Sequence, residues 1–238
     1  MNNKNKNRYS NFNKLIDYFF AVQAGLVDYP ITIAEINKLE FRVIYAIYNQ
    51  TLIANQYSRS ARSIYLKKSN PTQSGYCFSP NPDKTDFTGE IGQQIFYFLM
   101  NSYEQHTPRP EIIFEEHPPG RIFRRAVIHD LKLTNVQTQA IAPIEIKTAF
   151  ISDNKSRCNV ISTKEGDFIK HKKNNEKIYV LVYVKGDWLD FKSLTFQIFA
   201  APISFLDAIG REFFYLSNPR TKIRLIDIDD LLQDSKYL

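Results

Sequence analysis

Residues 177–185, KIYVLVYVK, place the strongest limit on how this chain can fold. Apolar and aromatic side chains occupy both the odd and the even positions between the two terminal lysines. Successive residues of a strand point to opposite faces, so this pattern predicts a central strand that is covered on both sides. Residues 194–200 are predicted to form another strand, and helical patterns occur elsewhere. The sequence therefore predicts an α/β fold, with a mixed central sheet flanked by helices.

The segment IEIK at residues 144–147 carries the clearest chemical signal. In a strand, Glu145 and Lys147 would share one face, while Ile144 and Ile146 would pack into a core on the other. Asp130 lies fifteen residues upstream of Glu145, in a predicted strand at 121–133. Residues 134–139 between the two are polar enough to turn. A hairpin would place Asp130 beside Glu145 and Lys147.

Two carboxylates and a lysine at one sheet edge suit metal-assisted phosphodiester hydrolysis. Carboxylate oxygens are ligands for Mg²⁺, which lowers the pKa of water and offsets negative charge on phosphorus. A lysine there would orient the attacking water and stabilise the developing charge. Other acid-x-lysine triplets occur, and the strongest competitor joins Asp130 and Lys132 to the upstream Glu116. A further alternative is a half-exposed strand on which Glu145 and Lys147 form only a surface ion pair.

The pattern Asp-x14-Glu-x-Lys resembles the catalytic signature of the PD-(D/E)xK nuclease superfamily, and the chain is most similar to a type II restriction endonuclease. The resemblance covers about residues 90–184, although His129 and not proline precedes Asp130. It implies a restriction-endonuclease-like core at 89–238, behind a helical region at 1–88. It also implies that Asp130, Glu145 and the Ile146 carbonyl hold Mg²⁺, and that Lys147 acts on water. An acid on the preceding helix, at the place of Glu90, often reaches such a site.

The charge distribution favours a polyanionic partner. The chain has a formal net charge of +6, and its basic residues gather in clusters. Phosphate contacts supply most of the non-specific affinity for DNA, although each cluster could equally be solvated surface. The candidate DNA-binding residues are Arg59, Arg62, Lys67, Lys68, Lys164, Lys170, Lys172 and Lys173. His171 lies in the last of these clusters and is predicted to be a phosphate contact or plain surface.

The remaining segments allow several readings. Residues 1–13 are predicted to be a mobile basic arm and 11–28 an amphipathic helix. Thr32 is predicted to cap a second helix that continues to residue 53, and 55–88 form a long irregular region. Helices are also expected at 89–99, 163–174 and 204–215. Two cysteines far apart in sequence give no disulfide framework and suit a reducing cytoplasm. No apolar run approaches the length that spans a bilayer.

The resemblance makes a sequence-specific, Mg²⁺-dependent double-stranded DNA endonuclease the leading expectation. It also implies a homodimer, because two-fold protein symmetry matches a palindromic site. A structure-specific or repair nuclease with the same core is an alternative. A non-catalytic DNA-binding protein that uses the N-terminal helices is another. No phosphate-binding loop motif occurs, so no nucleotide cofactor is implied.

Overall fold

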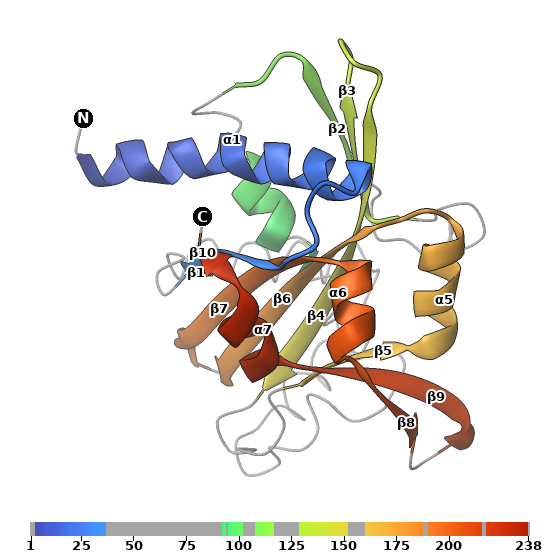
Figure 1. Cartoon of the computed structure of the whole chain (residues 1–238). Coiled ribbons are helices and arrows are strands. Elements are labelled where there is room, and N and C mark those ends of the chain that lie inside the picture. The colour runs from blue at the N-terminus through green and yellow to red at the C-terminus, as the bar shows by residue number, and fades with distance from the viewer. Residues whose placement is uncertain are drawn as a thin grey trace, which may run out of the picture.

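A computed structural model describes residues 3–36, 92–93, 95–101, 108–116, 129–151, 160–187, 190–215 and 218–237. These residues form a mixed seven-stranded sheet with helices on its faces, which confirms the predicted α/β class (Figure 1). In spatial order the strands are β10 (Lys236–Tyr237), β1 (Ile31–Ile36), β7 (Asp190–Pro202), β6 (Ile178–Asp187), β4 (Ile141–Ile151), β3 (Leu131–Asn135) and β2 (Ile112–Glu116).

Strand β6 lies at the centre of this sheet, as its sequence predicts. It runs parallel to β4 and antiparallel to β7. Its side chains alternate between two cores: Ile178 and Val180 belong to one, and Tyr179 and Leu181 belong to the other. The sheet therefore needs a covering layer on each face, because both sets of side chains are buried.

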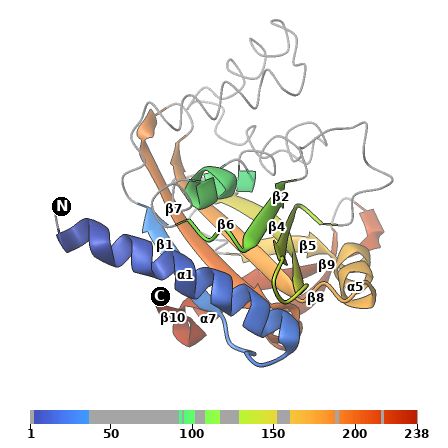
Figure 2. The ribbon, with the colours of Figure 1, turned by 90° about the horizontal axis from the view of Figure 1, so that it is seen from above.

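Helices from different parts of the chain supply these two layers. The first core contains helix α1 (Asn3–Ala24) and a helical segment within residues 92–101. Figure 2 shows α1 running across the sheet. The second core contains α5 (Glu165–Lys173), α6 (Ile203–Ile209) and α7 (Ile228–Asp234). A second, three-stranded antiparallel sheet packs beside α5; its strands are β5 (Val160–Lys164), β9 (Asn218–Asp227) and β8 (Arg211–Tyr215).

The N-terminal segment differs from its prediction. Helix α1 begins at Asn3, so the expected mobile arm is helical, and the chain turns away at Gly25 with a φ of 76°. The helix predicted to start at Thr32 is wrong over the described residues, since 31–36 form β1. β-branched residues at 31–33 suit a strand, and pairing with β7 and β10 satisfies their backbone groups. α1 and β1 are thus built into the same core as the later strands.

The helix predicted for residues 204–215 is also only partly correct. Helix α6 ends at Ile209, and the aromatic run that follows belongs to β8. Gly210 lies at the boundary between them. A Cβ there would lie 2.6 Å from the Leu206 carbonyl oxygen and 2.8 Å from the Arg224 side chain. Only glycine therefore allows the chain to leave α6 so close to this arginine.

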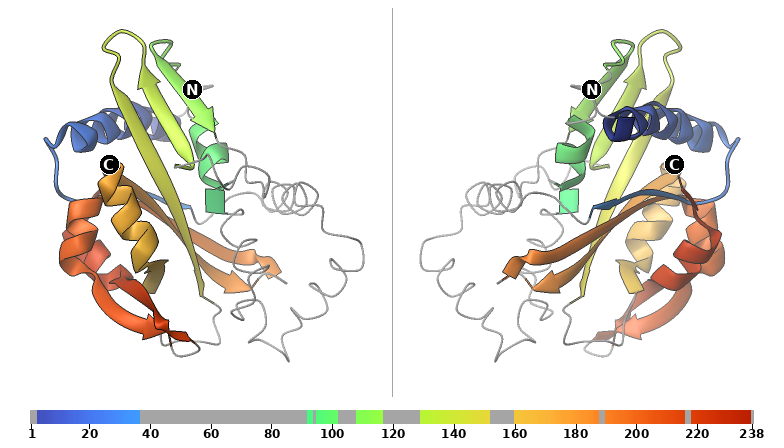
Figure 3. Two further views of the ribbon diagram at one scale, coloured as in Figure 1. Left: turned by 90° about the vertical axis from the view of Figure 1, so that its right-hand side faces the viewer. Right: turned by 90° about the vertical axis from the view of Figure 1, so that its left-hand side faces the viewer.

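Strands β2, β3 and the first part of β4 extend beyond the other strands as a ribbon (Figure 3). The β3–β4 connection confirms the polar turn predicted from the sequence. The Asn135 side chain accepts hydrogen bonds from the backbone N–H groups of Gln137 and Thr138, both at 3.0 Å. Pro143 causes no conflict, because β4 pairs with β6 only from Ile144 onward.

Candidate active site

Glu145 and Lys147 lie on one face of β4, as the strand pattern predicts. The Lys147 ammonium donates to Glu145 Oε1 at 2.5 Å. Ile144 and Ile146 point the other way, into the core under α1. Glu145 is only 7% exposed, so this pair differs from an ordinary surface ion pair.

Asp130 approaches the same place from the end of β3. Leu131 pairs with Ile144, which puts Asp130 next in register opposite Glu145. The strand predicted at 121–133 is shorter where it is described, because β3 begins at Leu131 and Asp130 occupies a bend. The bend turns the carboxylate back onto β4, where Oδ2 accepts from the Ile146 N–H at 2.8 Å.

The helical segment within 92–101 holds Asp130 from the opposite side. Gln93 donates to Asp130 Oδ1 at 2.6 Å, and the Tyr97 hydroxyl donates to the Asp130 carbonyl at 2.6 Å. Gly92 allows this approach, since a Cβ there would lie 1.8 Å from the Thr148 hydroxyl. The sequence prediction missed Gln93 and Tyr97. Their spacing of four residues on a predicted helix was the available signal.

Charge at the site favours a bound cation. Burial and the neighbouring Glu145 raise the pKa of Asp130 to about 7, although the Ile146 N–H and Lys147 oppose this shift. Burial alone would lower the pKa of Lys147, but Glu145 and Asp130 raise it, so the lysine stays charged. The Asp130 carboxylate uses two of its roughly four acceptor positions for Gln93 and Ile146. A divalent ion between Asp130 and Glu145 would relieve their repulsion.

A histidine reaches the same carboxylate from α5. His171 was predicted to be a phosphate contact or plain surface, and this is wrong, because it is only 5% exposed. Its Nε2 lies 3.5 Å from Glu145 Oε1, and its Nδ1 is hydrogen-bonded to Glu176 Oε2. Phe168 and His171 are both buried on one face of α5. Their spacing of three residues could have indicated an inward histidine.

The turn after α5 places Glu176 over His171. Asn175 adopts a left-handed conformation, with a φ of 59°. The Glu176 N–H donates to the His171 carbonyl and the Asn175 N–H to the Lys172 carbonyl, which is the hydrogen-bond pattern of a Schellman motif. This backbone reversal brings the Glu176 side chain back toward the helix. Glu176 was not among the predicted site residues, since its position depends on the helix ending where it does.

Three buried oxygen atoms around the site lack hydrogen-bond partners among the described residues: Glu176 Oε1, Tyr179 Oη and Gln93 Oε1. Tyr179 pairs with Glu145 in the β4–β6 register, and its ring lies edge-on to His171. Burial and the nearby carboxylates of Glu145 and Glu176 raise the pKa of Tyr179 far above its ordinary value, so the hydroxyl keeps its proton. Buried polar atoms without partners mark places where a ligand or water completes the structure.

The competing motif is not assembled in the same way. Lys132 forms an ion pair with Glu115 on the adjacent strand β2. Glu116 is exposed and accepts a hydrogen bond from Asn101 at 3.2 Å. The structure thus brings Asp130 together with Glu145 and Lys147, and it directs Lys132 elsewhere.

The predicted DNA-binding residues are described only in part. Lys170, Lys172 and Lys173 are exposed on α5, which confirms the short basic helix, but Lys172 is paired with Asp207 at 2.5 Å. Lys164 is the last residue of β5. The other predicted contacts, Arg59, Arg62, Lys67 and Lys68, lie outside the described residues, as does Glu90.

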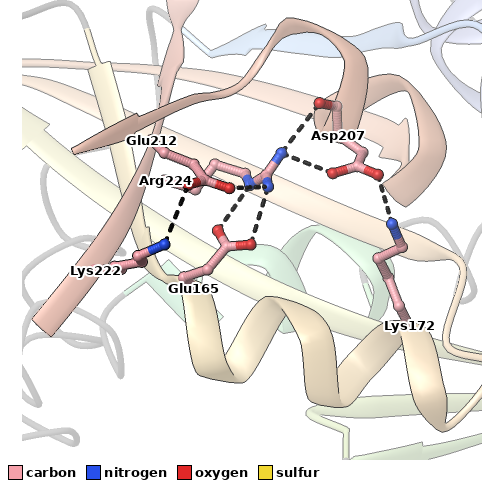
Figure 4. A network of polar contacts seen from close by, with 6 residues as sticks. All are labelled: Glu165, Lys172, Asp207, Glu212, Lys222 and Arg224. Atoms are coloured by element: carbon pink, nitrogen blue, oxygen red, sulfur yellow. Dashed lines mark hydrogen bonds and ion pairs between the residues drawn. The ribbon is translucent and has the colours of Figure 1, made fainter.

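A buried arginine fixes α5 in place (Figure 4). Arg224 of β9 donates two hydrogen bonds of 2.9 Å to Glu165, the first residue of α5. It also donates to Asp207 of α6 at 2.7 Å, and its guanidinium lies 4.7 Å from the Phe168 ring centre. A bidentate arginine–carboxylate pair is both strong and directional. The helix that carries His171 is therefore attached to the three-stranded sheet and to α6.

Comparisons with models of known families, with curated proteins and with solved structures gave no match for this chain. Among the described residues, no helix is long and apolar enough to cross a membrane.

Proposed function

We propose that this protein is a Mg²⁺-dependent endonuclease that hydrolyses phosphodiester bonds in double-stranded DNA, in the manner of a type II restriction enzyme. The observation that carries the proposal is the convergence of Asp130, Glu145 and Lys147 at one place on the sheet. These are the groups that the resemblance to PD-(D/E)xK nucleases requires, and they come from strand β4 and from the bend that precedes β3.

Each group has a role that its surroundings support. Asp130 and Glu145 would hold Mg²⁺, with the Ile146 carbonyl as a further ligand; the bound ion would stabilise negative charge on the phosphate and make water more acidic. Gln93 and the Ile146 N–H fix the orientation of the Asp130 carboxylate. Lys147 keeps its charge beside Glu145, so it would orient the attacking water and stabilise the pentavalent phosphorus.

The basic residues support DNA as the substrate. Lys170 and Lys173 are exposed on α5, the helix that also reaches Glu145 through His171. Cations beside a carboxylate site hold the phosphate backbone where the acids alone would repel it. We further propose a homodimer, because a two-fold axis would present two such sites to the two strands of a palindrome.

The test is incubation of supercoiled plasmid with the protein and Mg²⁺, followed by sequencing of the ends. We expect linear product with ends at one short sequence. Ends at DNA junctions or at random positions would favour a structure-specific nuclease instead. Glu145→Gln should abolish cleavage, and Glu115→Gln, which removes the acid beside the competing Lys132, should not. Absence of cleavage by the folded wild-type protein with Mg²⁺ on varied DNA would refute the proposal.

A further inference from the structure

The Glu145 carboxylate faces two different partners, and only one of them belongs to the proposed nuclease motif. Lys147 contacts Oε1 from β4, while His171 approaches the same oxygen from α5. The three side chains Glu145, His171 and Glu176 are buried together, with ligand atoms that lie within 4.8 Å of one another. A nitrogen donor between two carboxylates has no part in the Mg²⁺ site described above.

We propose that Glu145 and His171 form a second metal position, which takes a divalent first-row transition ion such as Zn²⁺ or Fe²⁺ and is oriented by Glu176. This inference deepens the proposed function and rests on it only for the role of the ion in DNA cleavage. Imidazole suits Zn²⁺, Fe²⁺ and Ni²⁺, whereas Mg²⁺ prefers oxygen ligands, and Mn²⁺, the weakest binder of the first-row series, serves as the spectroscopic probe. The site would therefore discriminate between metals by its histidine.

The distances fit two ligands of one ion. His171 Nε2 and Glu145 Oε1 are 3.5 Å apart, which is long for a direct hydrogen bond. Two ligand atoms at about 2.0–2.2 Å from an ion lie about 2.8–3.6 Å apart for angles between a right angle and the tetrahedral angle. The observed separation falls within that range.

Glu176 completes the arrangement as a positioning residue. Its Oε2 is hydrogen-bonded to Nδ1 of His171, and since an ionised carboxylate only accepts, Nδ1 would donate, which in a neutral imidazole leaves the lone pair of Nε2 facing Glu145. Histidines that bind metals commonly donate their other N–H to a carboxylate in this way, and loss of that carboxylate costs about 10–100-fold in metal affinity. Glu176 Oε1 and the Tyr179 hydroxyl are buried without hydrogen-bond partners among the described residues, which is an independent observation that fits a ligand at this cluster.

Three carboxyl groups that lie close to one lysine give the same indication. Glu145 and Glu176 are buried and Asp130 is partly buried, so three acids face the single base Lys147. A cation is the simplest way to balance this excess in a region with little access to water. The alternative is a protonated His171 that bridges Glu145 and Glu176 without metal.

Mn²⁺ binding in the absence of DNA tests the proposal. Continuous-wave EPR measures free Mn²⁺ and so gives the affinity, while pulsed EPR detects coupling to an imidazole nitrogen. We expect nitrogen coupling in the wild-type protein and its loss in His171→Gln. Affinity should fall at least tenfold in that variant and about 10–100-fold in Glu176→Gln. Gly166→Ala, an exposed change on the same helix with open space around it, is the matched control and should bind as wild type does.

Each outcome separates this site from the nuclease proposal. Asp130→Asn should keep the nitrogen coupling while it loses Mg²⁺-dependent cleavage. Nitrogen coupling without any cleavage would uphold the metal site and refute the nuclease. Cleavage with Mg²⁺, but no nitrogen coupling at saturating Mn²⁺, would refute the metal site alone and leave the bridging imidazolium. If His171→Gln does not fold, His171→Leu places an apolar side chain in the same buried position, and persistent nitrogen coupling there would overturn the assignment.

Discussion

Replacing Asp130 with asparagine should stabilise the metal-free protein while it abolishes cleavage. The structure accommodates the amide without rearrangement of the backbone. The asparagine oxygen would keep the hydrogen bond from the Ile146 N–H, and its NH₂ group would face Gln93. Rotation of the Gln93 amide would then pair its Oε1, which has no partner among the described residues, with that NH₂ group. The substitution also removes the repulsion with Glu145.

The expected increase in the free energy of unfolding of Asp130→Asn follows from the proton affinity of Asp130 in the wild-type protein. Burial, with Glu145, raises the pKa of this carboxyl from an ordinary 3.8 to about 7. At roughly 1.4 kcal/mol per tenfold change in proton affinity, ionising Asp130 costs the folded protein at most about 4 kcal/mol of stability. The Asp130 carboxyl is only partly buried, so solvent screening reduces this cost. We therefore expect Asp130→Asn to have a free energy of unfolding about 1–3 kcal/mol higher than that of the wild-type protein above pH 7. For a chain of this size that is about 2–12 °C in Tm.

The pH dependence has a defined sign. A carboxyl with a raised pKa holds its proton longer in the folded state than in the unfolded chain, so the folded state binds more protons between pH 4 and pH 7. The contribution of Asp130 to the free energy of unfolding of the wild-type protein is therefore largest below about pH 4 and is lost as the pH rises to about 7. The difference in stability between Asp130→Asn and the wild-type protein should be absent near pH 4, increase up to about pH 7 and stay constant above it.

Thermal melts in EDTA across pH 4–9 measure this difference directly. Asp28→Asn, at an exposed acid, is the control and should show no such trend. Addition of Mg²⁺ should reverse the order, because the ion stabilises the wild-type protein and not the variant. An Asp130→Asn protein that is less stable than wild type at pH 8 without metal would refute this account of the site's electrostatics.

Three further predictions test the surroundings of the site. Lys147→Arg should keep the fold, by circular dichroism, but lower the cleavage rate by orders of magnitude, because a planar guanidinium does not replace a compact ammonium; full activity would show that charge alone suffices. Gly92→Ala should destabilise the protein by about 1–3 kcal/mol in denaturant titrations, since the new Cβ would overlap β4, whereas Gly166→Ala, with open space around it, should not. Replacing Lys170 and Lys173 together with glutamine should lower DNA affinity for all sequences alike and flatten the slope of log K against log salt by about 1–2; an unchanged slope would assign both lysines to ordinary surface.

The sequence predicted those parts of the fold whose side-chain period is set by burial. β6 is apolar on both faces and lies at the sheet centre, and the alternation in β4 placed Glu145 and Lys147 together. The same reasoning failed at Thr32, where pairing with β7 and β10 outweighs a helical spacing of isoleucines. It also extended α6 too far, because Gly210 ends the helix and a strand with aromatic residues begins at Arg211.

The missed parts of the site depend on contacts between layers. Gln93 reaches Asp130 only because Gly92 lets its helix lie against β4. Glu176 reaches His171 only because Asn175 reverses the chain at the end of α5. No residue spacing in the sequence predicts either contact, because both depend on how the chain packs in the complete core.

The site draws its parts from both sides of the sheet. Gln93 holds Asp130 from the layer that contains α1, and His171 meets Glu145 from the layer that contains α5. A chain with only one of the two cores formed would lack one half of these contacts. Completion of folding is therefore a condition for the proposed activity, and we expect a folding intermediate, a truncated chain or a locally melted state to be inert toward DNA even when β4 itself is in place.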